Sequence, residues 1–286
     1  MDMSLDQEHS LLASSLGKIW REESSVGSWG ISLLAVKGAH VQTFGAGCSS
    51  RSLKTMLSKI GPLADKAAGI TVDLLVARPA PSGNFPVIFD PWVSEDFLEL
   101  LAPAFCADRV WRGLSPYRGA LGRTIASPLV TMIDDGRATF GVAGSIWDDE
   151  GFLARPTTVV QEGVLCSYLY DLAGARRDGC RTTASAARSF GGAPSPAPSN
   201  FYIKAGSTLP SEIVRETKRG LYLLELQGLH TVDLADGDFS LGGVGLWIEG
   251  GEKACAVDQF TVTGNIFDMM KKIDCVGSDL EFNGPL

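Results

Sequence analysis

Histidine is scarce in this chain, which has three among its 286 residues: His9, His40 and His230. A protein zinc site needs three or four convergent ligands, and no two of these histidines are close enough to share one helix. The six cysteines are widely spaced, and the sequence has no CxxC pair. We therefore expect no zinc site in this chain, and reduced thiols rather than disulfides.

Long apolar runs and excess positive charge are also missing. No uninterrupted apolar stretch approaches the roughly 18–20 residues that a transmembrane helix needs. Residues 1–10 are acidic and polar, which is unlike a secretory signal. The net charge is −8 and the pI about 5.0, so the surface repels phosphate backbones. The sequence predicts a cytoplasmic protein with neither a membrane nor a nucleic acid as partner.

Familiar catalytic motifs are missing as well. There is no GxSxG elbow or Walker A loop, and Gly45–Gly47 lacks the third glycine of a dinucleotide loop. The acidic run Asp148–Glu150 could serve acid–base or metal chemistry, but side chains that cap a turn are the favoured interpretation. Asp236–Ser240 allows the same two interpretations, and the turn is again favoured. Cys166 and Cys180 are each either a nucleophile or a small packing residue, and His230 is expected to be a hydrogen-bonded structural histidine.

What the chain does contain is typical of a soluble α+β protein, with 45% apolar residues and 33 glycines. We expect a small N-terminal α/β piece at residues 1–80 that is reduced in size, and a β-rich domain at 81–286 with mainly antiparallel strands. The boundary is placed in the Pro/Gly/Ser-rich stretch 78–86. The first piece is predicted to contain a helical pattern in 1–30, hairpin strands at 31–36 and 41–44, a helix at 53–68 broken at Gly61–Pro62, and a strand at 70–77.

The second part begins with a strand at 87–89, followed by a helix for which Asp90 is the N-cap and Pro91 the first residue. Further strands are predicted from alternation and turn residues, and helices from capping signals. The predicted strands are 128–133, 151–153, 157–161, 164–169, 201–203, 221–226, 245–248 and 256–262. The predicted helices are 173–179, 209–219 and 266–272, and residues 184–199 are expected to form a mobile surface loop.

From Gly163 onward the sequence resembles the C-terminal region of the TldD/TldE (PmbA) metalloprotease family. The matching blocks are GVLCSYLYDLAGARRDG, APSNFYIKAGSTLPSEIVRETKRGLYLLELQG, DGDFSLGGVGLWIEGGEKACAVDQFTVTGNIFDMM and VGSDLEF. The resemblance extends back through IWDDEG to about Val87, so it covers roughly the last two thirds of the chain. The first eighty residues match poorly and are shorter than the family's usual N-terminal domain.

In this family the active subunit carries HExxxH on a helix, and a later cysteine completes the zinc site. The corresponding helix here is 92–107. In one register the motif positions are Ala102, Pro103 and Ala107, and in the other they are Glu99, Leu100 and Ala104. Neither register supplies a histidine, and the chain ends before a late cysteine. The resemblance therefore implies a TldE-type subunit without catalytic or metal residues.

The resemblance also implies a partner and a substrate. A TldD-like subunit would hold the zinc in a hollow heterodimer, and the pair would hydrolyse an unfolded peptide or a small amide, as in a natural-product pathway. Two alternatives stay open: a metal-independent hydrolase or transferase that uses Asp148, Asp149 or Cys166, and a scaffold protein without a catalytic partner. The candidate substrate or interface residues are Asn200, Phe201, Tyr202, Gly243, Gly245 and Trp247.

Overall fold

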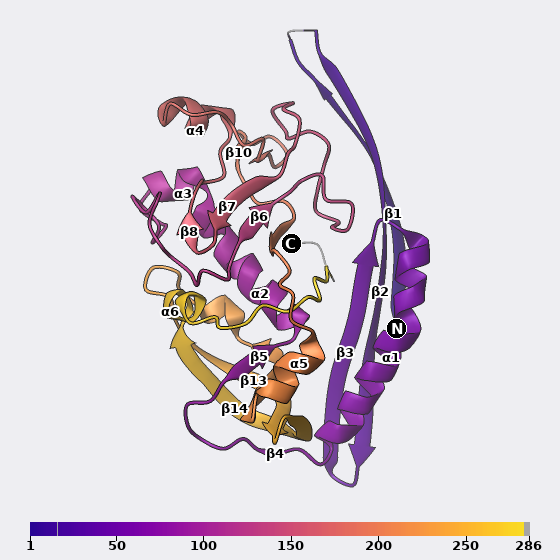
Figure 1. Cartoon of the computed structure of the whole chain (residues 1–286). Helices are drawn as coiled ribbons and strands as arrows, with labels where there is room; N and C mark the ends of the chain where they lie inside the picture. The colour runs from indigo at the N-terminus through magenta and orange to yellow at the C-terminus, as the bar shows by residue number, and fades with distance from the viewer. Residues whose placement is uncertain (16, 283–286) are drawn as a thin grey trace.

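A three-stranded antiparallel sheet begins the computed structural model, which describes residues 1–15 and 17–282 (Figure 1). β1 (Asp2–Ala13) pairs with β2 (Ile19–Lys37), and β2 pairs with β3 (His40–Ser50). The predicted β2–β3 hairpin is confirmed. The helical pattern predicted within residues 1–30 is wrong. Because nearly every side chain of β1 is exposed, no buried face forces apolar and polar residues to alternate there.

One long helix, α1 (Leu53–Leu74), packs on this sheet. The helix itself was predicted, but the break at Gly61–Pro62 and the strand at 70–77 are wrong. Pro62 lies within the helix on its exposed side, where water can satisfy the freed carbonyl. The β-branched residues near position 70 stay helical because Ala67, Ile70 and Leu74 bury one face at helical spacing.

A five-stranded sheet is the centre of the remaining chain and has the order β4-β14-β13-β12-β5. Its three long strands form an antiparallel meander, and a short parallel strand lies at each edge. The turn predicted at Glu249–Glu252 is confirmed, with positive φ at Gly250 and Gly251. The strands are β4 (Arg78–Pro79), β5 (Val87–Phe89), β12 (Arg219–Gln227), β13 (Asp238–Glu249) and β14 (Glu252–Asn265).

Helix α2 (Pro91–Leu101) lies against this sheet and begins as predicted, with the Asp90 carboxylate accepting a hydrogen bond from Trp92 N. The chain continues as a 3-10 turn, η1 (Ala102–Phe105), and a short helix, α3 (Ala107–Trp111). In the main core the Phe105 ring stacks on Tyr117 with a centroid separation of 4.7 Å.

A smaller sheet of order β11-β6-β7-β8 packs beyond α2. The turn predicted at Glu162–Gly163 is confirmed and joins β7 to β8 with positive φ at both residues. The predicted strand at 151–153 is reduced to one bridge between Trp147 and Leu153, and the predicted loop 184–199 holds a two-stranded ladder. The strands are β6 (Met132–Asp134), β7 (Thr157–Gln161), β8 (Val164–Leu165), β9 (Ala186–Ala187), β10 (Ser195–Pro196) and β11 (Phe201–Ile203).

Four short helical elements complete the fold: α4 (Leu172–Arg177), α5 (Pro210–Glu216), η2 (Leu229–Thr231) and α6 (Ile266–Lys271). Helix α5 ends before the predicted Arg219, because the chain from that residue enters β12. Within the described ranges, no helix combines the length and apolar character that crossing a bilayer requires. The predicted α+β class with mainly antiparallel strands is confirmed.

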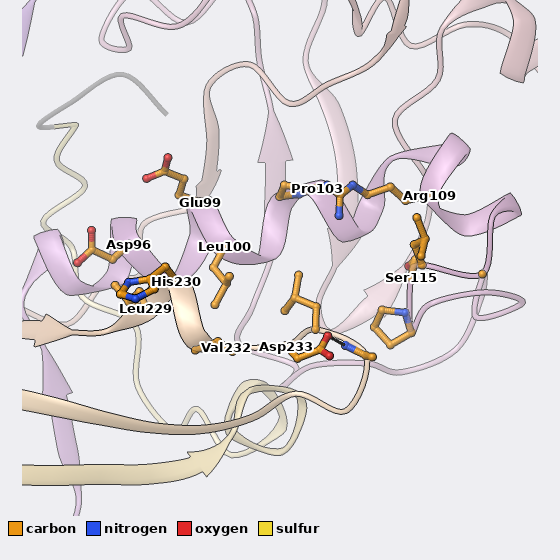
Figure 2. Close-up of a pocket in the computed structure, with 15 residues that line it drawn as sticks. Asp96, Glu99, Leu100, Pro103, Arg109, Ser115, Leu229, His230, Val232 and Asp233 are labelled. Carbon is orange, nitrogen blue, oxygen red and sulfur yellow. Dashed lines mark hydrogen bonds between the residues drawn. The ribbon is translucent and has the colours of Figure 1, made fainter.

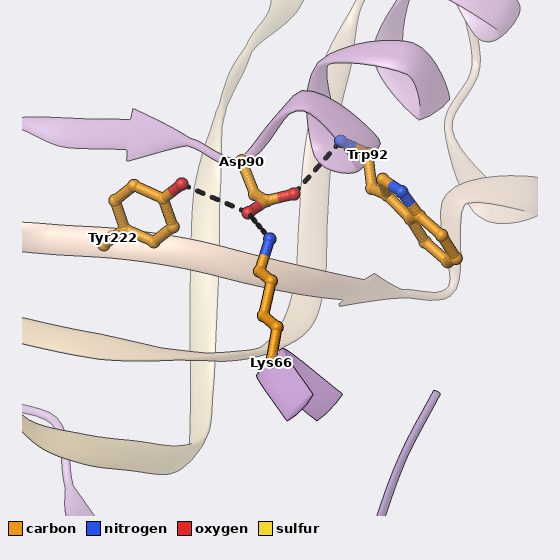
Figure 3. A network of polar contacts seen from close by, with 4 residues as sticks. All are labelled: Lys66, Asp90, Trp92 and Tyr222. Carbon is orange, nitrogen blue, oxygen red and sulfur yellow. Dashed lines mark hydrogen bonds and ion pairs between the residues drawn. The ribbon is translucent and has the colours of Figure 1, made fainter. Parts of the chain in front are cut away.

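The boundary placed at residues 80 and 81 stays a prediction. Several polar contacts cross it, among them two between side chains: Lys66 Nζ lies 2.7 Å from Asp90 Oδ2, and Gln42 Nε2 donates to Asp258 Oδ2 at 3.0 Å. Asp90 Oδ2 also accepts a hydrogen bond from the Tyr222 hydroxyl at 3.1 Å (Figure 3). A single buried carboxylate therefore joins α1, the start of α2 and β12.

Candidate functional site

Helix α2 borders two cavities. The larger, of about 1270 Å³, lies between α2, β11, α5, α6 and residues 273–282. The smaller, of about 730 Å³, is lined by Asp96, Glu99, Leu100 and Pro103 together with Arg109 and the segments 113–116 and 229–235 (Figure 2). The positions that the sequence resemblance assigns to the family's zinc motif lie on this helix or directly after it.

The motif positions do not form a metal site in either register. Ala102 is 1% exposed and Ala107 is 0% exposed, and the two lie in different elements because α2 ends at Leu101. In the other register Ala104 is buried, and its carbonyl accepts a hydrogen bond from Ser115 Oγ at 2.6 Å.

Alanine, proline and leucine side chains offer no metal ligand. The first register therefore has no ligand, and the second has only the Glu99 carboxylate. Over residues 1–15 and 17–282, no group of three or more His, Cys, Asp or Glu side chains is placed to hold a metal ion. The residues present in this chain do not fit a zinc ion.

The smaller cavity carries a concentration of negative charge. Burial, followed by the charges of the Glu99 and Glu225 carboxylates, raises the pKa of Asp96 to about 6. His230 lines the same cavity on the exposed turn η2, and the structural role predicted for this histidine stays a prediction. Two side chains that were not singled out from the sequence, Asp96 and Arg109, therefore share a cavity with His230. They come from separate elements, and no motif links them.

Among the candidate residues, Phe201 and Tyr202 line the larger cavity. The Phe201 ring is buried and stacks on Phe105 at 5.6 Å. The half-buried Tyr202 ring makes edge contacts with Phe140 and Phe282, both at 5.6 Å. Burial, followed by the charges of neighbouring aspartates, raises the pKa of the Tyr202 hydroxyl. Strand β11 pairs with β6 on one side and lies at the edge of its sheet, beside this cavity.

Asn200 is buried and holds a loop in place. Its side-chain amide donates to the carbonyl of Asp135 at 2.9 Å, and its oxygen accepts from Ala143 N at 3.0 Å. The adjacent Asp134 accepts hydrogen bonds from Ser199 N at 2.6 Å and from Ser199 Oγ at 3.0 Å. Burial nevertheless raises the pKa of Asp134 to about 6, and the charge of Asp135 adds to the increase. Both polar side chains are thus engaged with this chain's own backbone.

The remaining candidates lie on β13, the central strand of the larger sheet, and line neither cavity. A Cβ on Gly245 would lie 2.6 Å from the Tyr222 carbonyl oxygen, and one on Gly243 would lie 2.8 Å from the Phe260 ring. Trp247 is buried, and its indole nitrogen donates to Glu249 Oε2 at 2.9 Å. These contacts give the three residues packing roles, and their contact with substrate or partner stays a prediction.

The acidic run Asp148–Glu150 caps local backbone, which confirms the favoured interpretation. Asp148 Oδ1 accepts from Phe152 N at 2.8 Å and from Glu150 N at 3.1 Å, while Asp149 Oδ2 accepts from Arg188 N at 2.6 Å. Glu150 Oε2 accepts from Leu172 N at 2.6 Å. The turn predicted at Asp236–Ser240 is confirmed only in its first part, where Asp238 N donates to Asp236 Oδ1 at 3.2 Å and Gly237 has positive φ; the chain from Asp238 already belongs to β13.

The fold is a mixed α+β body with two cavities beside α2, and comparison with known proteins places the chain in a family. The PmbA/TldA metallopeptidase C-terminal domain matches residues 82–286. A metalloprotease of Methanothermobacter thermautotrophicus is 35% identical over 210 residues, which cover 73% of this chain and 46% of that protein. The chain belongs to the PmbA/TldD metallopeptidase family.

Solved structures agree with this assignment. A Thermotoga maritima protein, described as a candidate modulator of a DNA gyrase, superposes with a TM-score of 0.87 at 27% identity and covers 96% of this chain and 62% of that one. TldE from Thermococcus kodakarensis also gives a TM-score of 0.87, at 22% identity, with 99% and 65% covered. At 22% identity, the similarity to the Thermococcus kodakarensis structure shows a shared fold. The chain spans about half of the Methanothermobacter thermautotrophicus metalloprotease, since the match covers 46% of that protein's length.

Proposed function

We propose that this chain is the zinc-less subunit of a TldD/TldE-type heterodimeric metalloprotease that hydrolyses peptide or small-molecule amide bonds. The observation that carries the proposal is that the positions assigned to the metal-binding motif offer at most one zinc ligand, the Glu99 carboxylate. In one register the two histidine positions are the buried residues Ala102 and Ala107, and in the other they are Glu99 and the buried Ala104. The zinc would be bound by a TldD-like partner subunit.

The contribution of this chain would be to enclose and orient the substrate. The larger cavity, of about 1270 Å³, is wide enough for a peptide segment, and β11 presents a sheet edge beside it. An extended peptide that joins such an edge is held by main-chain hydrogen bonds, which bind many sequences. Tyr202, which lies on β11, would pack against side chains of the bound substrate. A chamber of this kind admits unfolded peptides or small amides and excludes folded proteins.

Co-expression with a family member that carries HExxxH tests the proposal. Size-exclusion chromatography separates the species, and metal analysis then gives the zinc content of each. We expect a mixed complex with about one zinc per pair and none in the isolated chain. Stoichiometric zinc in this chain alone, or failure to associate with any such relative, contradicts the proposal.

The same preparations distinguish the two alternatives. A metal-independent hydrolase or transferase would turn over substrate as the purified single chain in the presence of a chelator. The side chains it would use are already engaged: Asp148 and Asp149 cap backbone, and the Cys166 thiol donates to Val164 O at 3.4 Å. A scaffold protein would instead remain apart from every HExxxH-bearing relative.

A further inference from the structure

The β1–β2 hairpin extends beyond the rest of its sheet. β2 pairs with β1 from Ile19 to Gly30, but pairs with β3 only from Gly27 to Lys37. Residues 6–13 and 19–26 therefore form a two-stranded ribbon, here called the arm, which projects past β3 and α1 (Figure 1). Because a two-stranded ribbon is marginally stable in water, the arm is a segment that further pairing would stabilise.

The body of the protein holds the arm by its β2 strand. Glu22 accepts a hydrogen bond from Ile146 N at 3.0 Å and also contacts Ser145 Oγ, and the Trp20 ring meets Trp147 edge-on at 6.3 Å. These contacts fix the direction in which the arm projects. Among the described residues, no strand pairs with the outer edge of β1, so its main-chain donors and acceptors face solvent over the whole strand.

The two faces of β1 differ in chemistry. Met3, Leu5 and Leu11 lie on one face, with Gln7 and His9 between Leu5 and Leu11, and are 64%, 66% and 61% exposed. The other face carries Asp2, Asp6 and Glu8, all of them exposed. Successive residues of a strand point to opposite faces, so a strand added at this edge would meet an apolar row on one side and a carboxylate row on the other.

We propose that the outer edge of β1 is the docking site for a β-strand of the partner subunit. This strand presents Lys or Arg toward Asp2, Asp6 and Glu8, and apolar side chains toward Met3, Leu5 and Leu11. The inference rests on the heterodimer of the proposed function and adds to it the surface through which the subunits join. Main-chain pairing along β1 supplies affinity, and the charge pattern selects the partner.

A second copy of this chain is the weaker occupant. In an antiparallel β1–β1 pair related by a two-fold axis, residues of one face stay on that face. Registers centred on Asp6, Gln7 or Glu8 then place a carboxylate of one copy opposite a carboxylate of the other. Like charges directly opposite each other destabilise a strand pair. A basic partner strand removes this repulsion and gains opposite-charge pairs instead.

The test uses the co-expressed complex with the HExxxH-bearing relative. The variant D6K/E8K reverses the carboxylate row, and the matched control D65K/D73K makes the same charge change on exposed positions of α1. We expect D6K/E8K to weaken the complex by about 10- to 100-fold and the control by less than about 2-fold. Hydrogen exchange should also show new protection of residues 2–13 in the complex.

Three results overturn the inference. A complex that forms normally with D6K/E8K, with no new protection of β1, places the interface elsewhere and leaves the proposed function intact. Self-association of this chain that D6N/E8Q strengthens identifies a second copy as the occupant. Absence of any complex with HExxxH-bearing relatives contradicts both the docking site and the proposed function.

Discussion

Lys66 on α1 and Asp90 at the start of α2 form an ion pair with an Nζ–Oδ2 distance of 2.7 Å (Figure 3). The Asp90 side chain is almost completely buried, whereas that of Lys66 is 46% exposed. The same carboxylate oxygen accepts the hydroxyl of Tyr222, which lies 132 residues further along the chain. The N-terminal sheet and helix are therefore tied to the body by a charge that would be buried without an ionic partner if Lys66 were removed.

Replacement of Lys66 tests this tie. Lys66→Met keeps the aliphatic stem but removes the ammonium group, so it should lower the free energy of unfolding by about 1–3 kcal/mol, less than for a fully buried pair. Lys54→Met on the same helix removes a lysine that forms no ion pair with the other described residues, and it should have little effect. Urea unfolding followed by circular dichroism measures both. Equal stability of the two variants would show that the pair contributes nothing.

Asp134 makes the stability depend on pH. An unfolded aspartate releases its proton near pH 4, whereas burial raises the pKa of Asp134 to about 6. Between these values the folded chain retains a proton that the unfolded chain has lost. The contribution of this group to stability is therefore full below about pH 4 and is lost as the pH rises through about 6.

Asp134→Asn should reduce this loss, because asparagine does not ionise and its oxygen can still accept from Ser199. Melting temperatures measured from about pH 4 to about pH 7 should fall less steeply for the variant than for the wild type. Asp96, whose pKa is also raised to about 6, should account for part of the remaining slope. The exposed Asp65→Asn should leave the profile unchanged. A wild-type slope in Asp134→Asn would disprove the assignment.

Gly245 should tolerate no side chain. A Cβ at this position would lie 2.6 Å from the Tyr222 carbonyl oxygen in the centre of the sheet, whereas at Gly242 the nearest atom is 3.7 Å away. We expect Gly245→Ala to cost about 1–3 kcal/mol of stability, and Gly242→Ala to lie within about 0.5 kcal/mol of the wild type. Thermal unfolding of the isolated chain separates the two. If Gly245→Ala left stability unchanged but impaired the complex, the residue would have an interface role.

Tyr202 should contribute to substrate binding in the assembled protease. Tyr202→Ala removes aromatic surface from the larger cavity, so KM for an unfolded peptide should rise about 10-fold with little change in kcat, as for a contact made equally in the ground and transition states. Phe190→Ala removes an aromatic ring that is fully exposed and should change neither constant. Unchanged KM in a folded Tyr202→Ala complex would exclude the contact.

Local signals in the sequence predicted the parts of the fold that local chemistry determines. Asp90–Pro91 specified the start of α2, and Glu162–Gly163 and Gly250–Gly251 specified tight turns, because capping and positive φ depend on few residues. The arm was predicted to be helical because its leucines are exposed, so no buried face imposes the alternation of apolar and polar residues that indicates a strand. The strand predicted at 70–77 failed because packing against β12 to β14 decides the conformation there.

In the candidate site, too, features that depend on local residue types could be predicted, whereas features that depend on long-range packing could not. The absence of zinc ligands at positions 102, 103 and 107 could be read from the sequence, since it depends on residue types alone. That Phe201 and Tyr202 share a cavity with residues 273–282 could not be read, since it depends on how distant segments pack. Asn200 and Gly245 were candidates because they lie in or beside strands that resemble the family's sequence blocks. In the structure the Asn200 side chain bonds to nearby backbone, and Gly245 leaves room for the Tyr222 carbonyl oxygen.

The order of strands in the central sheet also has a consequence for synthesis. β4 and β5 occupy the two edges, yet their neighbours β14 and β12 come from the last third of the chain. During synthesis, β4 and β5 cannot pair until more than a hundred further residues have been made, because their partner strands lie in β14 and β12. Because such long-range pairing is slow and leaves apolar strands exposed, nascent chains of this protein should depend on chaperones until the meander has emerged.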